Sequence, residues 1–173
     1  QELEQAGIAI IQMDEPGLRE GLPLRTDKRE EYLRWATDAF RLTINQTKPE
    51  TQIHTHTCYG DVRDILPVLR DLDIDVISIE AARSRLAFLK ALESQELPCD
   101  IGPGVWDIHS PRVPSTEELI ELIKLARTYV PDARLWINPD CGLKTRTPEE
   151  VWESLRHLVE ATRIVRSSLS PNA

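Results

Sequence analysis

The chain has 173 residues, of which 40% are hydrophobic and 29% charged, so it can bury one sizeable core and is too apolar for a disordered tail. Its 21 lysines and arginines against 29 aspartates and glutamates give a formal net charge of -8, which disfavours nucleic acids and anionic membrane surfaces as partners. No run approaches the roughly 18 continuous apolar residues of a membrane span, and no export signal is visible, so we expect a cytoplasmic protein.

Short runs rich in isoleucine and valine alternate with longer stretches of helical period, which is the pattern of a repeated βα unit. In chain order the sequence predicts strands at residues 7–14, 51–59, 75–80, 101–107 and 134–139. The intervening helices are predicted at residues 28–45, behind a cap at Asp61, and at residues 84–94. Two more are predicted behind capping boxes, one of Ser115 and Glu118 and one of Thr147 and Glu150, with Pro148 in the first turn of the latter.

Near-continuous apolar strands that alternate with helices are typical of a parallel sheet with both faces covered. Either an α/β barrel or a doubly wound sheet satisfies this pattern. No glycine-rich phosphate-binding motif follows a predicted strand, so the usual marker of a nucleotide-binding open sheet is missing from the sequence. A barrel places its chemistry on the loops after each strand, and nearly every histidine and cysteine of this chain lies there, which favours the barrel.

The polar residues at the predicted strand ends contain a candidate metal site. They are Asp14 and Glu15; His54, His56 and Cys58; Glu80; Asp107 and His109; and Asp140 and Cys141. His56 and Cys58 are two apart on one strand, so both side chains project from the same face. Glu80 and Cys141 close other strands and supply a carboxylate and a second thiolate, which completes a ligand set that zinc accepts. An H-x-C pair also occurs by chance and cysteines are often simply buried, so a core role stays open.

The charge of such a site indicates its chemistry. Two thiolates and a carboxylate around Zn²⁺ sum to about -1, which makes the metal a poor Lewis acid for water and disfavours hydrolysis. A thiol that enters the coordination shell loses its proton and stays electron-rich and nucleophilic. The ligand set therefore favours the alkylation of a bound thiol.

Five sequence blocks in order carry a resemblance to a known family. They are DEPGLREGLPLR (residues 14–25), HTHTCYGD (54–61), DVISIE (75–80), IGPGVWDIHSPRVPS (101–115) and WINPDCGLKTR (136–146). Together they resemble the catalytic C-terminal barrel of cobalamin-independent methionine synthase, from about Gln12 to the last helix. The length and order of the blocks make the resemblance highly specific.

The resemblance implies an enzyme that uses zinc to transfer a methyl group from 5-methyltetrahydropteroyltri-L-glutamate to the sulfur of L-homocysteine, giving L-methionine. It implies these roles: His56, Cys58, Glu80 and Cys141 as zinc ligands, Asp14 for the amino group of homocysteine, His109 as proton donor to the folate, and Glu20 on the folate side of the substrate site. Taken singly, the Asp14 motif is also typical of a turn, His109 of a loop organiser and Glu20 of solvated surface.

The resemblance also implies that the barrel is incomplete. The family's barrel has eight strands, so residues 1–173 would form the C-terminal portion, about the last five βα units, of a single catalytic (β/α)8 barrel. The earlier strands and an N-terminal barrel would be absent, and the only methionine, Met13, lies within a predicted strand, as in a piece of a longer protein. Two alternatives follow: another methyl donor, such as a methylcorrinoid protein, or a zinc-binding fragment without turnover.

Overall fold

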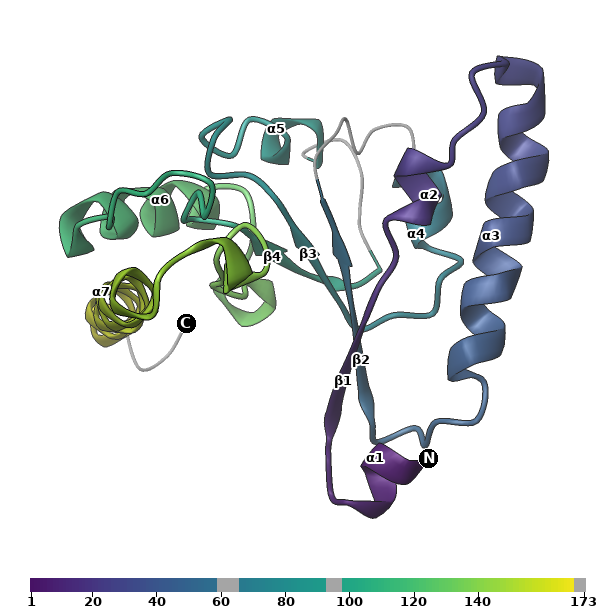
Figure 1. The fold of residues 1–173 in the computed structure, drawn as a ribbon, viewed down its shortest axis with the longest axis horizontal. Coiled ribbons are helices and arrows are strands. Elements are labelled where there is room, and N and C mark those ends of the chain that lie inside the picture. Colours follow the sequence, from purple (N-terminus) through teal and green to yellow (C-terminus); the bar gives the residue numbers. More distant parts are fainter. Residues whose placement is uncertain (59–65, 93–97, 170–173) are drawn as a thin grey trace.

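The computed structural model describes residues 1–58, 66–92 and 98–169, which contain a parallel sheet with helices (Figure 1). The sheet has the order β1-β2-β3-β4 and every neighbouring pair is parallel. Its strands are β1 (Ile10–Asp14), β2 (Gln52–Thr57), β3 (Val76–Ile79) and β4 (Asp100–Pro103). Four of the five predicted strands are therefore confirmed, each shorter than the sequence pattern indicated.

The fifth predicted strand, at residues 134–139, does not form as a regular strand. The segment runs beside β4 and pairs with it at two isolated bridges, Ile101 with Leu135 and Gly104 with Asn138. The backbone N–H of Trp136 donates to the carbonyl of Ile101 at 2.9 Å. A 3-10 helix at Asp132–Arg134 takes up the predicted start, and Pro139 has no N–H for a ladder at the other end. The segment thus lies at the edge of the sheet as a fifth, irregular element, which two bridges join to β4.

The helices occupy most of the predicted positions. They are α1 (Glu2–Gln5), α2 (Gly17–Glu20), α3 (Arg29–Ile44), α4 (Leu66–Leu69), α5 (Leu89–Leu92), α6 (Thr116–Arg127) and α7 (Pro148–Ser167), with further 3-10 helices at Thr26–Lys28 and Leu143–Thr145. Both predicted capping boxes are present: in α6 the N–H of Glu118 donates to the Ser115 hydroxyl at 3.2 Å, and α7 repeats the arrangement. The helix predicted behind Asp61 begins outside the described residues, which resume within it as α4.

The helix predicted at residues 84–94 is wrong in its first half. Residues 82–88 form turns, and α5 begins only at Leu89. Arg85 and Leu86 have φ angles of 49° and 62°, in the left-handed region that an α-helix cannot contain. The turn buries the side chains of Leu86 and Leu89 in the core, so burial overrides the local helical pattern.

The two faces of the sheet have different surroundings. Ile53, Ile77 and Ile79 point toward the helices and share a core with Phe40 of α3. The alternate residues face the other way, and Gln12, His54 and Val76 line a cavity of about 280 Å³ together with Trp136 and Asn138. In a closed barrel this second face lines the interior. Parallel strands in the sequential order β1-β2-β3-β4 are the arrangement of a (β/α)8 barrel, so the fold is part of such a barrel, and the face that lines its interior is present.

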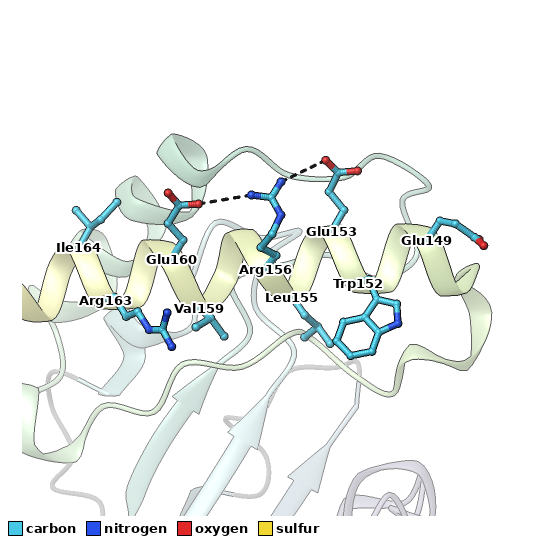
Figure 2. A pocket seen from close by; sticks show the side chains of 9 residues that line it. All are labelled: Glu149, Trp152, Glu153, Leu155, Arg156, Val159, Glu160, Arg163 and Ile164. Atoms are coloured by element: carbon cyan, nitrogen blue, oxygen red, sulfur yellow. Dashed lines mark hydrogen bonds and ion pairs between the residues drawn. The ribbon is translucent and has the colours of Figure 1, made fainter.

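A second core joins α6 and α7. Leu119 and Ile123 of α6 pack with Leu158 and Val165 of α7. The opposite face of α7 carries exposed apolar side chains, including Trp152 at 75% exposure, beside ion pairs that join Arg156 to Glu153 and Glu160 (Figure 2). Within the described residues, no helix is long and apolar enough to cross a membrane.

We expect neighbouring residues of α7 to differ sharply in their contribution to stability. Leu158→Ala removes a buried side chain and should lower the free energy of unfolding by about 2 to 5 kcal/mol. Val159→Ala, its matched control, trims a side chain that is 47% exposed and should change that free energy by about 0.5 kcal/mol or less. Urea denaturation of both variants measures the difference, and equal effects would contradict the assigned faces of the helix.

Candidate metal centre

His56 presents one ring nitrogen toward the site and uses the other as an anchor. It is buried near the end of β2, opposite Ser78 of β3 in the strand register. The His56 Nδ1 lies 2.8 Å from the Ser78 hydroxyl, which itself donates to the carbonyl of Thr55 at 3.4 Å. With the hydroxyl donating to Thr55, the tautomer with a proton on Nδ1 fits this contact, and that tautomer carries its lone pair on Nε2. This buried Nε2 has no hydrogen-bond partner within the described part of the chain, as expected of a nitrogen that serves as a metal ligand.

Two cysteines from distant segments meet beside this histidine. Cys58 follows β2 and Cys141 follows the bridged segment, and their sulfur atoms lie 3.6 Å apart. Burial, followed by the hydrogen bond with Cys141 and the charges of Cys141, Glu80 and Asp14, raises the pKa of the Cys58 thiol to about 12. A bound cation has the opposite effect on the Cys58 thiol, because it stabilises the thiolate that the acidic surroundings destabilise.

Glu80 completes the cluster from the end of β3. Its carboxylate is almost wholly buried, and its Oε1 lies 3.8 Å from Nε2 of His109. One ligand atom from each of His56, Cys58, Glu80 and Cys141 lies within 4.8 Å of the other three. An imidazole nitrogen, two sulfurs and a carboxylate oxygen form a donor set of the kind that zinc accepts. These four residues can therefore hold a metal ion.

Asp14 lies beside the cluster at the end of β1. It pairs in register with His56, and its Oδ1 accepts a hydrogen bond from the Gln12 amide at 2.8 Å. Asp14, His56 and Cys141 line the same 280 Å³ cavity on the interior face of the sheet. A small molecule in that cavity can reach both the Asp14 carboxylate and the metal ligands.

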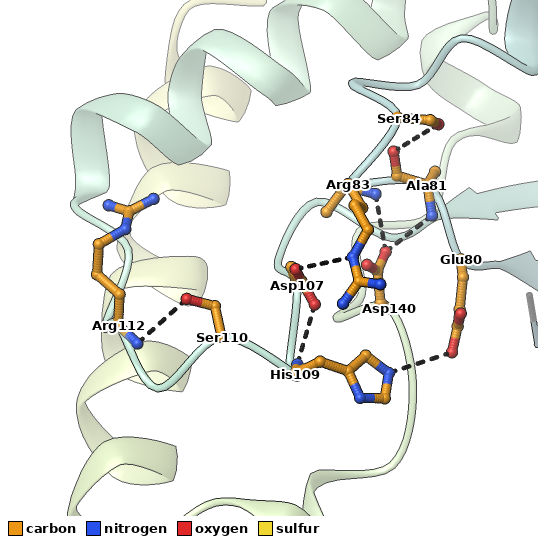
Figure 3. A network of polar contacts seen from close by, with 10 residues as sticks. Glu80, Ala81, Arg83, Ser84, Asp107, His109, Ser110, Arg112 and Asp140 are labelled. Atoms are coloured by element: carbon orange, nitrogen blue, oxygen red, sulfur yellow. Dashed lines mark hydrogen bonds and ion pairs between the residues drawn. The ribbon is translucent and has the colours of Figure 1, made fainter.

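His109 lies in the loop after β4, and its ring is directed at the Glu80 carboxylate (Figure 3). Its backbone N–H donates to Oδ1 of Asp107 at 2.9 Å, and Oδ2 of the same carboxylate lies 3.4 Å from Nε of Arg83. The His109 side chain is one-third exposed, so it borders the site and also faces solvent. Glu20 is exposed at the end of α2, and within the described residues no hydrogen bond or ion pair joins it to the cluster.

Two supporting residues were not identified from the sequence. Ser78, which holds His56, lies two residues before Glu80 on the same strand, and only the strand register reveals it. Asp140 was noted as a strand-end residue without a role, and it accepts backbone hydrogen bonds from the turn after Glu80. The strand spacing was the available signal for Ser78, whereas the contacts of Asp140 depend on tertiary structure.

Comparisons with known proteins agree on one family. Residues 1–164 match the family model described as cobalamin-independent synthase, catalytic domain. The chain is 57% identical over 166 residues to the 5-methyltetrahydropteroyltriglutamate–homocysteine methyltransferase of Syntrophotalea carbinolica, and 53% identical over 173 residues to that of Acidiphilium cryptum. These matches cover 96% and 98% of the chain, but the chain spans only 22% of the length of each relative.

Solved structures support the same fold. A B12-independent methionine synthase from Shewanella sp. W3-18-1, in complex with selenomethionine, matches with a TM-score of 0.80 at 23% identity. The match covers 96% of this chain and 51% of that one. A putative vitamin-B12 independent methionine synthase from Listeria monocytogenes matches with a TM-score of 0.72 at 19% identity, over 94% of this chain and 50% of that one.

We expect the chain to bind one divalent metal ion, because the four ligand atoms already converge. Cys58→Ser and Cys141→Ser each remove a thiolate and should lower metal occupancy sharply, as measured by elemental analysis after dialysis against zinc. Cys99→Ser is the matched control, since Cys99 is buried in the helix-facing core outside the cluster. Full occupancy in both ligand variants would contradict the assignment.

Proposed function

Since the chain belongs to the family of cobalamin-independent synthase catalytic domains, we propose that it is the zinc-binding part of a methionine-forming methyltransferase. The proposed reaction transfers the methyl group of 5-methyltetrahydropteroyltri-L-glutamate to the sulfur of L-homocysteine. The observation that carries the proposal is the convergence of His56, Cys58, Glu80 and Cys141. The relatives' names describe the same donor and acceptor. Within this proposal, residues 1–173 are the C-terminal portion of one catalytic barrel.

The four ligands would hold Zn²⁺ at the end of the sheet. When bound, zinc stabilises the thiolate form of an incoming thiol, so that the sulfur is a nucleophile near neutral pH. Two cysteine thiolates and the Glu80 carboxylate give the site a net charge of about -1, which disfavours hydroxide formation and hydrolysis. The Ser78 hydroxyl keeps His56 in the tautomer that offers Nε2. The ligand chemistry thus supports alkylation of a thiol over hydrolysis.

Asp14 would bind the ammonium group of homocysteine. Its carboxylate lines the same cavity as His56 and Cys141, so one amino acid can place its sulfur near the ligands and its ammonium near Asp14. A charge-assisted hydrogen bond of this kind orients the sulfur for attack.

His109 would act as the general acid. In the reaction a sulfur–carbon bond forms, the bond between the methyl carbon and N5 of the folate breaks, and N5 takes up a proton. An imidazole titrates near neutral pH and suits this step. The Asp107 carboxylate fixes the His109 backbone, which holds the ring at the edge of the site, beside Glu80.

The methyl donor would enter from the part of the barrel that this chain does not contain. Glu20, exposed on α2, is proposed to contact the folate side. Because much of the donor pocket depends on other strands, a methylcorrinoid protein is the alternative donor, and a metal-binding chain without turnover is the alternative for the isolated segment. Supplying the zinc-loaded complete enzyme with each methyl donor in turn distinguishes the two donors. Methionine formed only from the corrinoid would overturn the folate assignment. The three free cysteines suit the cytoplasm, which we propose as the location of the protein.

In the complete enzyme, we expect Asp14→Asn to weaken homocysteine binding more than it slows turnover at saturation. The variant removes the negative charge that pairs with an ammonium remote from the moving methyl, so KM should rise roughly 10- to 100-fold while kcat changes much less. Glu15→Gln is the matched control, because Glu15 is the adjacent acid and does not line the cavity. An unchanged KM with a collapsed kcat would count against this role.

His109→Asn separates proton donation from metal chemistry. If His109 serves the folate nitrogen, the variant of the complete enzyme should keep its zinc and its homocysteine affinity, while single-turnover methyl transfer slows by about 10² to 10⁴-fold. All three quantities can be measured on one preparation. Loss of zinc together with activity would make His109 a ligand or its support, and transfer within a few-fold of the wild-type rate would assign the proton to another group.

A further inference from the structure

Asp140 carries a carboxylate that is buried away from solvent. The residue is 2% exposed and immediately precedes the metal ligand Cys141. Its Oδ1 accepts two backbone hydrogen bonds, from the N–H of Ala81 at 2.8 Å and from the N–H of Ala82 at 2.9 Å (Figure 3). Because a buried carboxylate is costly unless it is well hydrogen-bonded, this pair of bonds accounts for the residue's position.

The two bonds connect the segments that carry two of the ligands. Ala81 and Ala82 directly follow Glu80, and Asp140 directly precedes Cys141. The two ligands, Glu80 and Cys141, are 61 residues apart in the chain. The backbone N–H of Asp140 also donates to the carbonyl of Trp106 at 2.9 Å, which ties in the loop after β4. Three segments at the active-site end of the sheet therefore meet at this one residue.

The sheet leaves space for this carboxylate at Gly104. A Cβ atom on residue 104 would lie 2.0 Å from Oδ1 of Asp140 and 2.6 Å from its Cα, far inside van der Waals contact. Gly104 thus permits the close approach of the two segments.

We propose that Asp140 is a positioning residue for the metal centre, which holds the Glu80 and Cys141 segments at the separation that a shared metal ion requires. The inference rests on the metal site proposed above. Metal ligands must lie within a few tenths of an ångström of their ideal distances, so a shift of the turn after Glu80 changes coordination without removing a ligand. Asp140 touches neither substrate nor ligand atom in this role and acts through the Ala81 and Ala82 amides.

The test uses the complete enzyme with Co²⁺ as the probe, because thiolate-to-cobalt charge transfer and the ligand-field bands report coordination directly. Asp140→Ala leaves two N–H groups without their acceptor and should weaken metal affinity about 10- to 100-fold, with altered ligand-field bands. Asp140→Asn keeps an Oδ1 acceptor and should restore both the affinity and the spectrum. Ile44→Ala is the control, since Ile44 is buried at the end of α3 in a core that contains none of the four ligands, and this change should leave both unchanged.

Each result decides a different point. Wild-type chain that binds no Co²⁺ overturns the metal centre and this inference with it. Wild-type binding matched by Asp140→Ala overturns only the positioning role, as does an Asp140→Asn variant as defective as Asp140→Ala. If Asp140→Ala does not fold, amide hydrogen exchange in the metal-free wild type decides. Protection of the Ala81 and Ala82 amides supports the inference, and exchange at the rate of exposed peptide overturns it.

Discussion

The parallel register of the strands is the constraint on which the site depends. Asp14 of β1 lies opposite His56 of β2, and His56 lies opposite Ser78 of β3. In a parallel sheet every strand ends at the same edge, so residues far apart in sequence become neighbours there. A shift of β2 by one residue would turn His56 toward the helices and separate it from its hydroxyl partner. The geometry of the candidate metal centre therefore depends first on the strand register and only then on the individual ligands.

Much of the fold could be predicted because local patterns and tertiary environment agree. The helices α6 and α7 begin at their predicted capping boxes, and each has one apolar face that the other buries. Agreement failed at residues 84–94, where a helical pattern forms a left-handed turn so that Leu86 can enter the core. It also failed at the fifth strand, where the flanking 3-10 helix and Pro139 restrict pairing. At Leu86 a contact distant in sequence outweighs local preference, whereas at the fifth strand the local backbone limits the pairing.

The candidate site divides in the same way. Ligand types were visible in the sequence, because histidine, cysteine and carboxylate residues stand at strand ends in a spacing that a barrel brings together. The residues that orient them were not visible. Ser78 and Asp140 are ordinary polar residues whose roles exist only through partners 22 or more residues away. Sequence patterns therefore predict donors, while the geometry that selects one metal position comes from the folded chain.

The electrostatics of the centre connect its structure to its chemistry. Glu80 and two thiols lie within reach of one another, with Asp14 nearby, and burial together with these acidic surroundings keeps the pKa of the Cys58 thiol far above its usual range. Such a cluster favours the binding of a cation. A divalent metal satisfies that preference only in part, because two thiolates and a carboxylate already exceed its charge. In the proposed reaction, the remaining negative charge would leave electron density on sulfur, which would oppose the activation of water and favour attack by a bound thiolate on an alkyl carbon.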